Sequence, residues 1–284
     1  ASFSHLRGLN PDMQGKGTME EMIDGIRYFW IRCPEYKGNG MGRIRNMLTF
    51  LAGLYRYQKQ ITAQGKPDAV IASSTYPLDI YPAHQIAKKN GAKLIYEVHD
   101  LWPLSPMELG GMSAKHPYIM LMQAAANYFF SDNDDVVSIL PSGKEHMVVH
   151  GMAPEKFVCI PNGIVKEDWE APIDPEKAPY RELLQEFHNQ GYFLIGYTGA
   201  HGIANALDSF IEAGGMLKDK KIKLILVGQG PERDRLMQKV VDLGLRNTVE
   251  LLSAVKRSDV PALLSEMDAL YVGLQRQPLF RFGV

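Results

Sequence analysis

The chain has 284 residues, of which 45% are hydrophobic, and 31 Lys and Arg residues balance 32 Asp and Glu residues to a net charge of -1. This length can bury a large core and favours two domains over one, while the near-zero charge gives no overall field that would attract nucleic acid. No stretch approaches the ~20 apolar residues that cross a bilayer. Cys33 and Cys159 lie far apart and lack metal-ligand spacing, which favours a cytosolic protein with reduced thiols over a disulfide scaffold.

The two ends of the chain suggest a piece of a longer protein. There is no initiator Met or signal peptide at the amino end, and the carboxyl end follows directly on a predicted strand, where an α/β unit continues into a helix. We therefore expect an internal fragment in which both domains are incomplete and the first strand of the amino-terminal domain is missing.

Strand and helix patterns alternate through the first half of the chain. Short apolar runs predict strands, and apolar residues at helical spacing predict helices. The predicted strands cover 25–32, 68–73, 93–100, 136–140 and 157–161, and the predicted helices cover 41–60, 80–90 and 116–131. This alternation indicates an α/β fold built on parallel sheets.

The helix predicted at 41–60 is amphipathic and basic. It carries Arg43, Arg45, Arg56 and Lys59, with Lys37 just before it. Such a helix can lie on anionic lipid headgroups, which predicts a cytoplasmic protein with peripheral contact to the inner face of the membrane. A solvated helix face is the simpler interpretation of the same pattern.

The apolar periodicity weakens between 164 and 191, where Pro172, Pro175 and Pro179 accompany a run of charged residues. Such breaks mark domain boundaries. We predict an amino-terminal Rossmann-like domain at 1–165, a linker at 166–190 and a carboxyl-terminal Rossmann-like domain at 191–284.

The second half contains two glycine turns, each directly after a predicted strand. Gly199 and Gly202 follow a strand at 193–197, and Gly228 and Gly230 follow the all-apolar strand 224–227, which is suited to burial on both faces. Pro231 and Glu232 suit the first turn of the next helix, which Gly244 would end. Free N–H groups at such a helix start suit a phosphate or a ribose hydroxyl.

Four motifs resemble the GT-B, family 4 glycosyltransferases. They are YEVHDLWP at 96–103, IPNGIV at 160–165, YTGAHGIANAL at 197–207 and VGQGPE at 227–232. The order and spacing of the motifs also fit, and the likeness is greatest to the WbuB-like group of bacterial capsule and O-antigen biosynthesis. The resemblance implies two doubly wound parallel-sheet domains that face each other across a cleft.

The resemblance also implies an activity. A sugar would be transferred from a nucleotide-sugar, with a bias to UDP, to a lipid-linked or glycan acceptor in polysaccharide biosynthesis. The transfer would retain the anomeric configuration and would need no metal or other cofactor. The turn at Gly199, Ala200, His201 and Gly202 would approach the diphosphate, while Gly228, Gly230, Pro231 and Glu232 would face the nucleoside. Main chain at Val255 and Lys256 would meet the base.

On the acceptor side, His99 matches the family histidine that faces the donor sugar, which makes it the candidate catalytic residue. Asp100 and Trp102 are candidates for substrate binding, although Trp102 fits packing equally well, and Ser142 is a weaker candidate. His201 fits either a phosphate contact or a solvent-exposed loop histidine. Many family members carry Arg and Lys in the loop that reads GAHGIANAL here. The cation must then come from Arg276, Arg281 or residues beyond 284, and of these we choose Arg281.

Two alternative functions remain at this point. A UDP-sugar 2-epimerase shares the architecture but needs carboxylates in the cleft, for which only Glu97 and Asp100 are available. A non-catalytic nucleotide-binding subunit would explain the missing loop cations. A dehydrogenase is disfavoured because no G-x-G-x-x-G with a later acidic residue follows a strand.

Overall fold

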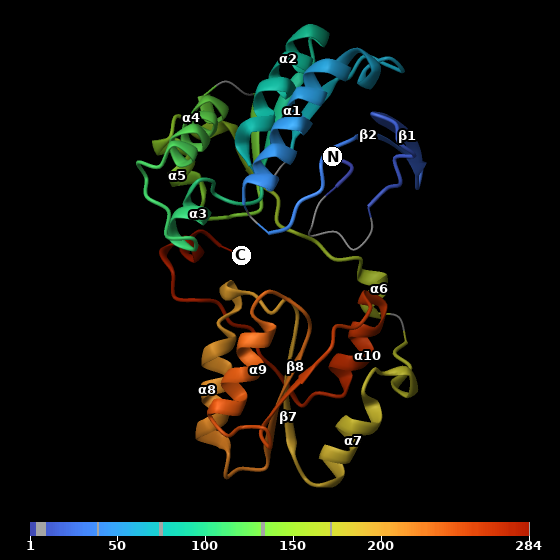
Figure 1. Cartoon of the computed structure of the whole chain (residues 1–284), viewed down its shortest axis with the longest axis vertical. Coiled ribbons are helices and arrows are strands. Elements are labelled where there is room, and N and C mark those ends of the chain that lie inside the picture. Colours follow the sequence, from blue (N-terminus) through green and yellow to red (C-terminus); the bar gives the residue numbers. More distant parts are fainter. Residues whose placement is uncertain (4–9, 39, 74–75, 132–133, 171, 284) are drawn as a thin grey trace. The chain divides into compact units, whose positions relative to one another are not determined.

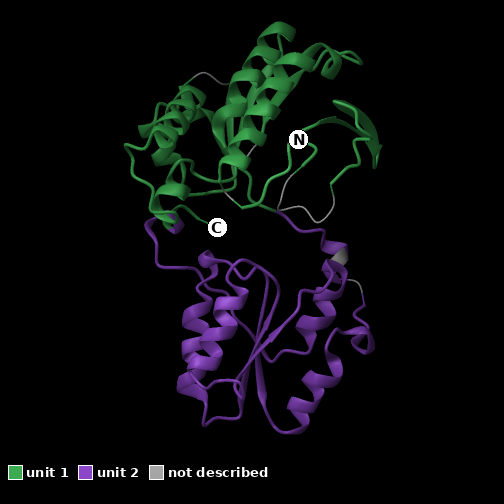
Figure 2. Ribbon diagram, viewed as in Figure 1, with its two compact units in different colours: residues 1–162, 281–284 green, residues 163–280 purple. Residues whose placement is uncertain are grey.

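The computed structural model describes residues 1–3, 10–38, 40–73, 76–131, 134–170 and 172–283 (Figure 1). The chain divides into two compact units (Figure 2): unit 1 comprises residues 1–162 and 281–284, and unit 2 comprises residues 163–280. Among the helices in the described ranges, none combines the length and the apolar content that a membrane crossing requires.

Unit 1 is built on a parallel sheet in the order β3-β4-β5-β6. Its strands are β3 (Ala69–Ala72), β4 (Lys93–Val98), β5 (Asp135–Ser138) and β6 (Phe157–Cys159), and its helices are α1 (Met41–Ile61), α2 (Ile80–Asn90), α3 (Leu104–Glu108), α4 (Pro117–Ser131) and α5 (Lys144–Val149). Every strand and helix predicted in this part after residue 40 is present, with ends that shift by a few residues.

The strand predicted at 25–32 does not join that sheet. It is β2 (Ile26–Ile31), which pairs antiparallel with β1 (Thr18–Ile23) as a separate hairpin. Four of the six residues of β1 are exposed, so the strand shows no regular alternation of buried and exposed positions. This absence of a buried face explains why sequence periodicity did not predict β1.

Unit 2 is also built on a parallel sheet, in the order β10-β7-β8-β9. Its strands are β7 (Phe193–Thr198), β8 (Ile222–Val227), β9 (Val249–Leu252) and β10 (Ala269–Leu270), and its helices are α6 (Lys166–Glu170), α7 (Arg181–Asn189), α8 (Leu207–Leu217), α9 (Arg233–Asp242) and α10 (Val260–Ser265). The strand order reverses between β7 and β10. Such a switch point is where ligands bind in open α/β sheets, beyond the carboxyl ends of the strands.

The central strand β8 explains the layers of unit 2. Leu224 and Leu226 point into one cluster with α8 and α9, and Ile225 and Val227 point into another with α7 and α10. Figure 1 shows these helix pairs on opposite faces of the sheet. The prediction that 224–227 is buried on both faces is confirmed, and so is the prediction that Gly244, with a φ of 65°, follows the end of α9.

The stretch expected to be a linker, 166–190, contains α6 and α7. Helix α7 buries Leu184 and Phe187 against the sheet of unit 2. The weak apolar periodicity of this stretch therefore reflects its short helices and its prolines.

Candidate functional site

The two glycine turns of unit 2 lie main chain against main chain. The Gly199 N–H donates to the carbonyl of Val227 at 3.0 Å, and the His201 N–H donates to the carbonyl of Gln229 at 2.8 Å. In return, the His201 carbonyl accepts from the N–H of Glu232 at 3.0 Å. The turn after β7 and the turn after β8 thus form one hydrogen-bonded structure at the carboxyl edge of the sheet.

At two positions in this contact, only glycine fits. A Cβ on Gly228 would collide with the carbonyl oxygen of Gly199, and a Cβ on Gly230 would collide with the main chain of His201. Neither position has a positive φ. Gly228 and Gly230 are therefore required here for close approach of the backbone and not for backbone conformation.

The same arrangement leaves donors free. Within the described residues, the N–H groups of Ala200, Gln229 and Gly230 have no hydrogen-bond acceptor. The hydroxyl oxygen of Thr198, at the end of β7, is buried and also has no partner. Unsatisfied donors grouped on two turns that lead into helices are suited to an anion, because main-chain N–H groups that point to one place attract negative charge.

A cavity of about 380 Å³ opens beside these groups. Its lining includes four of the residues predicted to bind the nucleotide-sugar, Gly199, Ala200, Gly228 and Val255. The full lining is Thr198, Gly199, Ala200, Val227, Gly228, Gln229, Ala254, Val255 and Val260. The other residues of that predicted set, which do not line it, are His201, Gly202, Gly230, Pro231, Glu232 and Lys256.

His201 is completely buried, so the interpretation as a solvent-exposed loop histidine is wrong. Neither ring nitrogen has a hydrogen-bond partner among the described residues. Burial, and to a lesser extent the positive charge of Arg233, lower the pKa of this imidazole, which keeps it neutral. Its main chain, through the bonds to Gln229 and Glu232, holds the two turns together.

The turn after β7 contains no lysine or arginine, and neutral donors fix the carbonyl of Ala200 within it. The Tyr197 hydroxyl and the Asn205 side-chain amide both donate to the carbonyl of Ala200 at 2.8 Å. This carbonyl is thereby tied back to its own turn. We infer that the turn offers an anion main-chain dipoles and no side-chain charge.

The segment after β9 keeps main-chain groups available. The Tyr180 hydroxyl donates to the carbonyl of Ser253 at 3.1 Å, and the carbonyl of Lys256 accepts from the N–H of Asp259 at 3.0 Å. The N–H and carbonyl of Val255 have no partner in the described part of the chain. Val255 thus presents one donor and one acceptor beside the cavity.

In unit 1, His99 lies just beyond the carboxyl end of β4 in a polar cluster. The Ser73 hydroxyl donates to Glu97 Oε2 at 2.5 Å, and its oxygen lies 3.0 Å from His99 Nε2. Because that hydroxyl has a single proton, His99 Nε2 must be the donor, and in the neutral ring Nδ1 carries the lone pair. Ser73 was absent from the sequence prediction because an isolated serine after a short strand has no distinguishing pattern.

The neighbours of His99 differ in their surroundings. Asp100 is exposed, whereas Trp102 packs against the cluster formed by Met47, Leu78 and Met122. The Trp102 ring also meets Tyr118 edge-on, with ring centroids 6.4 Å apart. These contacts favour the packing interpretation for Trp102.

Ser142 and Arg281 come together in unit 1, although they lie 139 positions apart in the sequence. The Ser142 N–H donates to the carbonyl of Phe282 at 3.0 Å, and the two predicted residues line a cavity of about 550 Å³ with Glu145 and His146. Burial, the neighbouring His150 and Arg281 lower the pKa of His146 to about 4. Arg281 is thus the cation of this cavity.

Comparison with known families identifies the chain. The model of the glycosyl transferase 4-like domain matches residues 9–163, and the model of glycosyl transferases group 1 matches residues 182–279. The chain belongs to the glycosyl transferase 4-like family. The curated Escherichia coli K12 protein WcaI, named as a glycosyl transferase of colanic acid biosynthesis, is 24% identical over 258 residues. The alignment covers 89% of this chain and 62% of WcaI.

Solved glycosyltransferase structures share the fold of this family member. Anabaena Alr3699/HepE in complex with UDP is 19% identical with a TM-score of 0.59, over 81% of this chain and 57% of that one. WaaG, a glycosyltransferase involved in lipopolysaccharide biosynthesis, is 18% identical with a TM-score of 0.62, over 86% of this chain and 62% of that one. At this identity the likeness establishes the GT-B type of α/β fold, as predicted. The chain spans roughly three fifths of the length of these proteins.

The close contact of the glycine turns can be tested through stability. Gly228→Ala should lower the free energy of unfolding by about 1–3 kcal/mol, because the added methyl group meets a fixed carbonyl. Gly215→Ala is the matched control, since its Cβ would be 4.0 Å from the nearest atom, Leu245 Cδ1, and a helical alanine should add about 0.5–1 kcal/mol. Urea unfolding measures both, and equal stability of the two variants would contradict the described contact.

Proposed function

We propose that the protein is a retaining, metal-independent glycosyltransferase that uses a UDP-sugar. The acceptor would be a lipid-linked or glycan hydroxyl in cell-surface polysaccharide biosynthesis. Family membership and the relation to WcaI support the class of reaction. The complexes of HepE with UDP and with UDP-glucose, in a protein of the same fold, support a nucleotide-sugar donor.

One observation carries the proposal for the donor site, namely the grouping of free N–H groups on two turns in main-chain contact. Ala200 supplies one of these donors, and Gln229 and Gly230 supply the others. They can stabilise the charge that develops on the diphosphate as it leaves, because fixed dipoles need no reorganisation during the reaction. Val255 would meet the base with its free N–H and carbonyl.

His99 would act on the donor sugar. The Ser73 hydroxyl accepts from Nε2, which leaves Nδ1 as a hydrogen-bond acceptor for a sugar hydroxyl. The proposed chemistry breaks the bond between the anomeric carbon and the diphosphate oxygen. A bond to the acceptor oxygen forms on the same face, and the acceptor proton leaves with the diphosphate. We propose that Ser142 and Arg281 bind substrate in the cavity that they share, and that exposed Asp100 does so beside His99.

The donor proposal is tested by isothermal titration of UDP and GDP into the purified protein and its His99→Ala variant. UDP should bind with higher affinity than GDP, and His99→Ala should keep this binding within about threefold, since its effect falls on sugar transfer. UDP-sugar turnover by His99→Ala should fall by about 10²-fold or more.

Two outcomes would contradict the proposal. If the folded protein bound neither nucleotide, the turns of unit 2 would not be a donor site. If His99→Ala lost UDP binding to the same extent as turnover, His99 would be a nucleotide ligand and not a catalytic residue.

We also propose that α1 contacts an anionic membrane. Exposed residues recur on one face of this helix at spacings of three and four: Met41, Arg45, Leu48, Ala52, Tyr55 and Lys59. Met41 is 77% exposed and Leu48 is 53% exposed. A stripe that mixes apolar and basic side chains can bury the former at the headgroup boundary while the latter meet lipid phosphates.

The membrane proposal predicts charge-dependent sedimentation with vesicles. The protein should bind vesicles of phosphatidylcholine with phosphatidylglycerol and should not bind phosphatidylcholine alone. The double variant Arg45→Gln/Lys59→Gln should bind the anionic vesicles about tenfold more weakly, while Lys218→Gln/Lys220→Gln, which removes the same charge from unit 2, should bind them as the wild type does. Equal binding by the two variants would contradict a role for α1.

A further inference from the structure

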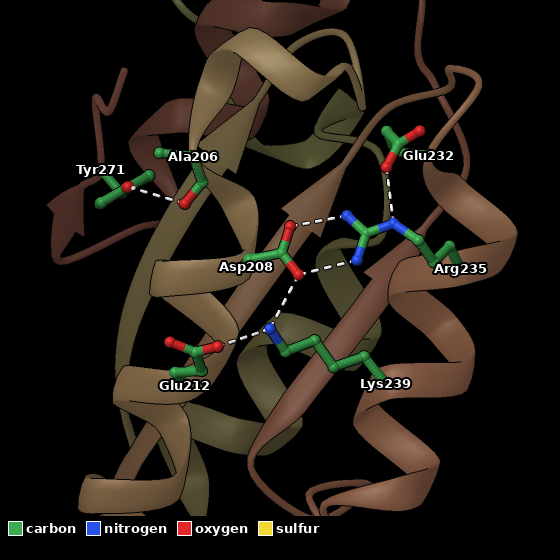
Figure 3. A network of polar contacts seen from close by, with 7 residues as sticks. All are labelled: Ala206, Asp208, Glu212, Glu232, Arg235, Lys239 and Tyr271. Carbon is green, nitrogen blue, oxygen red and sulfur yellow. Dashed lines mark hydrogen bonds and ion pairs between the residues drawn. The ribbon is translucent and has the colours of Figure 1, made fainter. Parts of the chain in front are cut away.

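Helices α8 and α9 are joined by a network of charged side chains in which Arg235 is central (Figure 3). Arg235 Nη1 donates to Asp208 Oδ1 at 2.8 Å and Nη2 donates to Asp208 Oδ2 at 2.6 Å, while Nε donates to Glu232 Oε2 at 2.6 Å. Lys239 extends the network and donates to Asp208 at 2.8 Å and to Glu212 at 2.6 Å. Bidentate pairing of this kind fixes direction as well as distance.

The partners of Arg235 lie at the starts of the two helices that follow the glycine turns. Asp208 is in the first turn of α8, and Glu232 is the residue directly before α9. The main chain of Glu232 is itself bonded to the carbonyl of His201. One guanidinium therefore links the end of the first turn to the end of the second.

The opposite side of the α8 start is held separately. Ala206 precedes α8 with a φ of 51°, and its carbonyl accepts from the Tyr271 hydroxyl at 3.3 Å (Figure 3). The Tyr271 ring stacks on Phe210, with ring centroids 4.3 Å apart. Tyr271 directly follows β10, so this side of the α8 start is held by the sheet edge, while on the other side Arg235 pairs Asp208 with Glu232, just before α9.

The network also changes the pKa values of its members and neutralises their charges. Hydrogen bonds from Arg235 and Lys239 hold the pKa of Asp208 well below its usual range. The bonds to Asp208 and Glu232 raise the pKa of Arg235 further above its already high value. Without Arg235, Glu232 would lose its cation beside turns whose free donors suit an anion, and Asp208 would keep only Lys239.

We propose that Arg235 is a positioning residue of the donor site, which fixes the spacing of the two glycine turns and neutralises Glu232 so that the turns accept a diphosphate. The inference rests on the proposed function. Arg235 does not itself bind the ligand, because its donors are directed to Asp208 and Glu232. Arg235 should therefore affect the binding of the diphosphate, and the binding of the nucleoside should depend on it much less.

The test compares Arg235→Gln with Lys239→Gln in titrations of UDP and of uridine into the purified protein. Both variants remove one cation from the same pair of helices, but only Arg235→Gln releases Glu232. We expect Arg235→Gln to weaken UDP binding about tenfold, because its charge-assisted hydrogen bonds to Asp208 and Glu232 are lost, and to change uridine binding much less. Lys239→Gln should bind both ligands as the wild type does.

Melting temperatures and a double variant distinguish a positioning role of Arg235 from a general loss of stability. The side chain of Arg235 is 51% exposed and that of Lys239 is 22% exposed, and both pair with carboxylates that are themselves partly exposed. Both variants should therefore melt within a few degrees of the wild type. The double variant Arg235→Gln/Glu232→Gln should recover part of the UDP affinity, because the uncompensated carboxylate is gone.

Several results would overturn the inference. One is equal loss of UDP affinity in Arg235→Gln and Lys239→Gln, and another is equal loss of UDP and uridine affinity in Arg235→Gln. Unchanged UDP binding by Arg235→Gln would do the same. If the wild type bound uridine and UDP with equal affinity, or bound neither, the failure would be that of the proposed donor site.

Discussion

Main-chain contact between the turn after β7 and the turn after β8 is the constraint on which the candidate donor site depends. Hydrogen bonds from Gly199 to Val227, from His201 to Gln229 and from Glu232 to His201 occupy one set of backbone groups. This pairing leaves the N–H groups of Ala200, Gln229 and Gly230 unoccupied on the same edge of the sheet. The site is thus a consequence of how two parallel strands end side by side, at residues where a side chain would not fit.

The same main-chain contact also determines how an anion would be bound at this edge of the sheet. The turn after β7 offers no lysine or arginine, the histidine within it is buried and neutral, and the nearby Arg235 is engaged by two carboxylates. An anion at this edge would be held by dipoles that the fold orients in advance. Such groups keep their direction without the entropy loss that a long charged side chain pays on binding. Arg235 then matters for where those dipoles lie.

Sequence patterns predicted the parts of this structure that depend on local periodicity. The all-apolar run at 224–227, the glycines after it and the stop at Gly244 have direct local causes, and the four sequence motifs by themselves indicated the family. The residues that sequence did not predict depend on contacts between distant segments. Ser73 meets His99 from the end of a neighbouring strand, and Arg235 acquires its role by meeting Asp208 from another helix. The buried His201 lies close to the main chain at Gly228 and Gly230, a contact that no property of its own turn reveals.

The most direct test of the central claim is the set of amide chemical shifts in isotope-labelled protein as UDP is added. The account predicts that the largest changes occur at Ala200, Gln229 and Gly230, whose N–H groups would gain phosphate acceptors, with a further change at Val255. Amides that are already bonded within the turns, such as those of Gly199 and His201, should shift less. Saturable UDP binding that left Ala200, Gln229 and Gly230 unshifted would contradict the account.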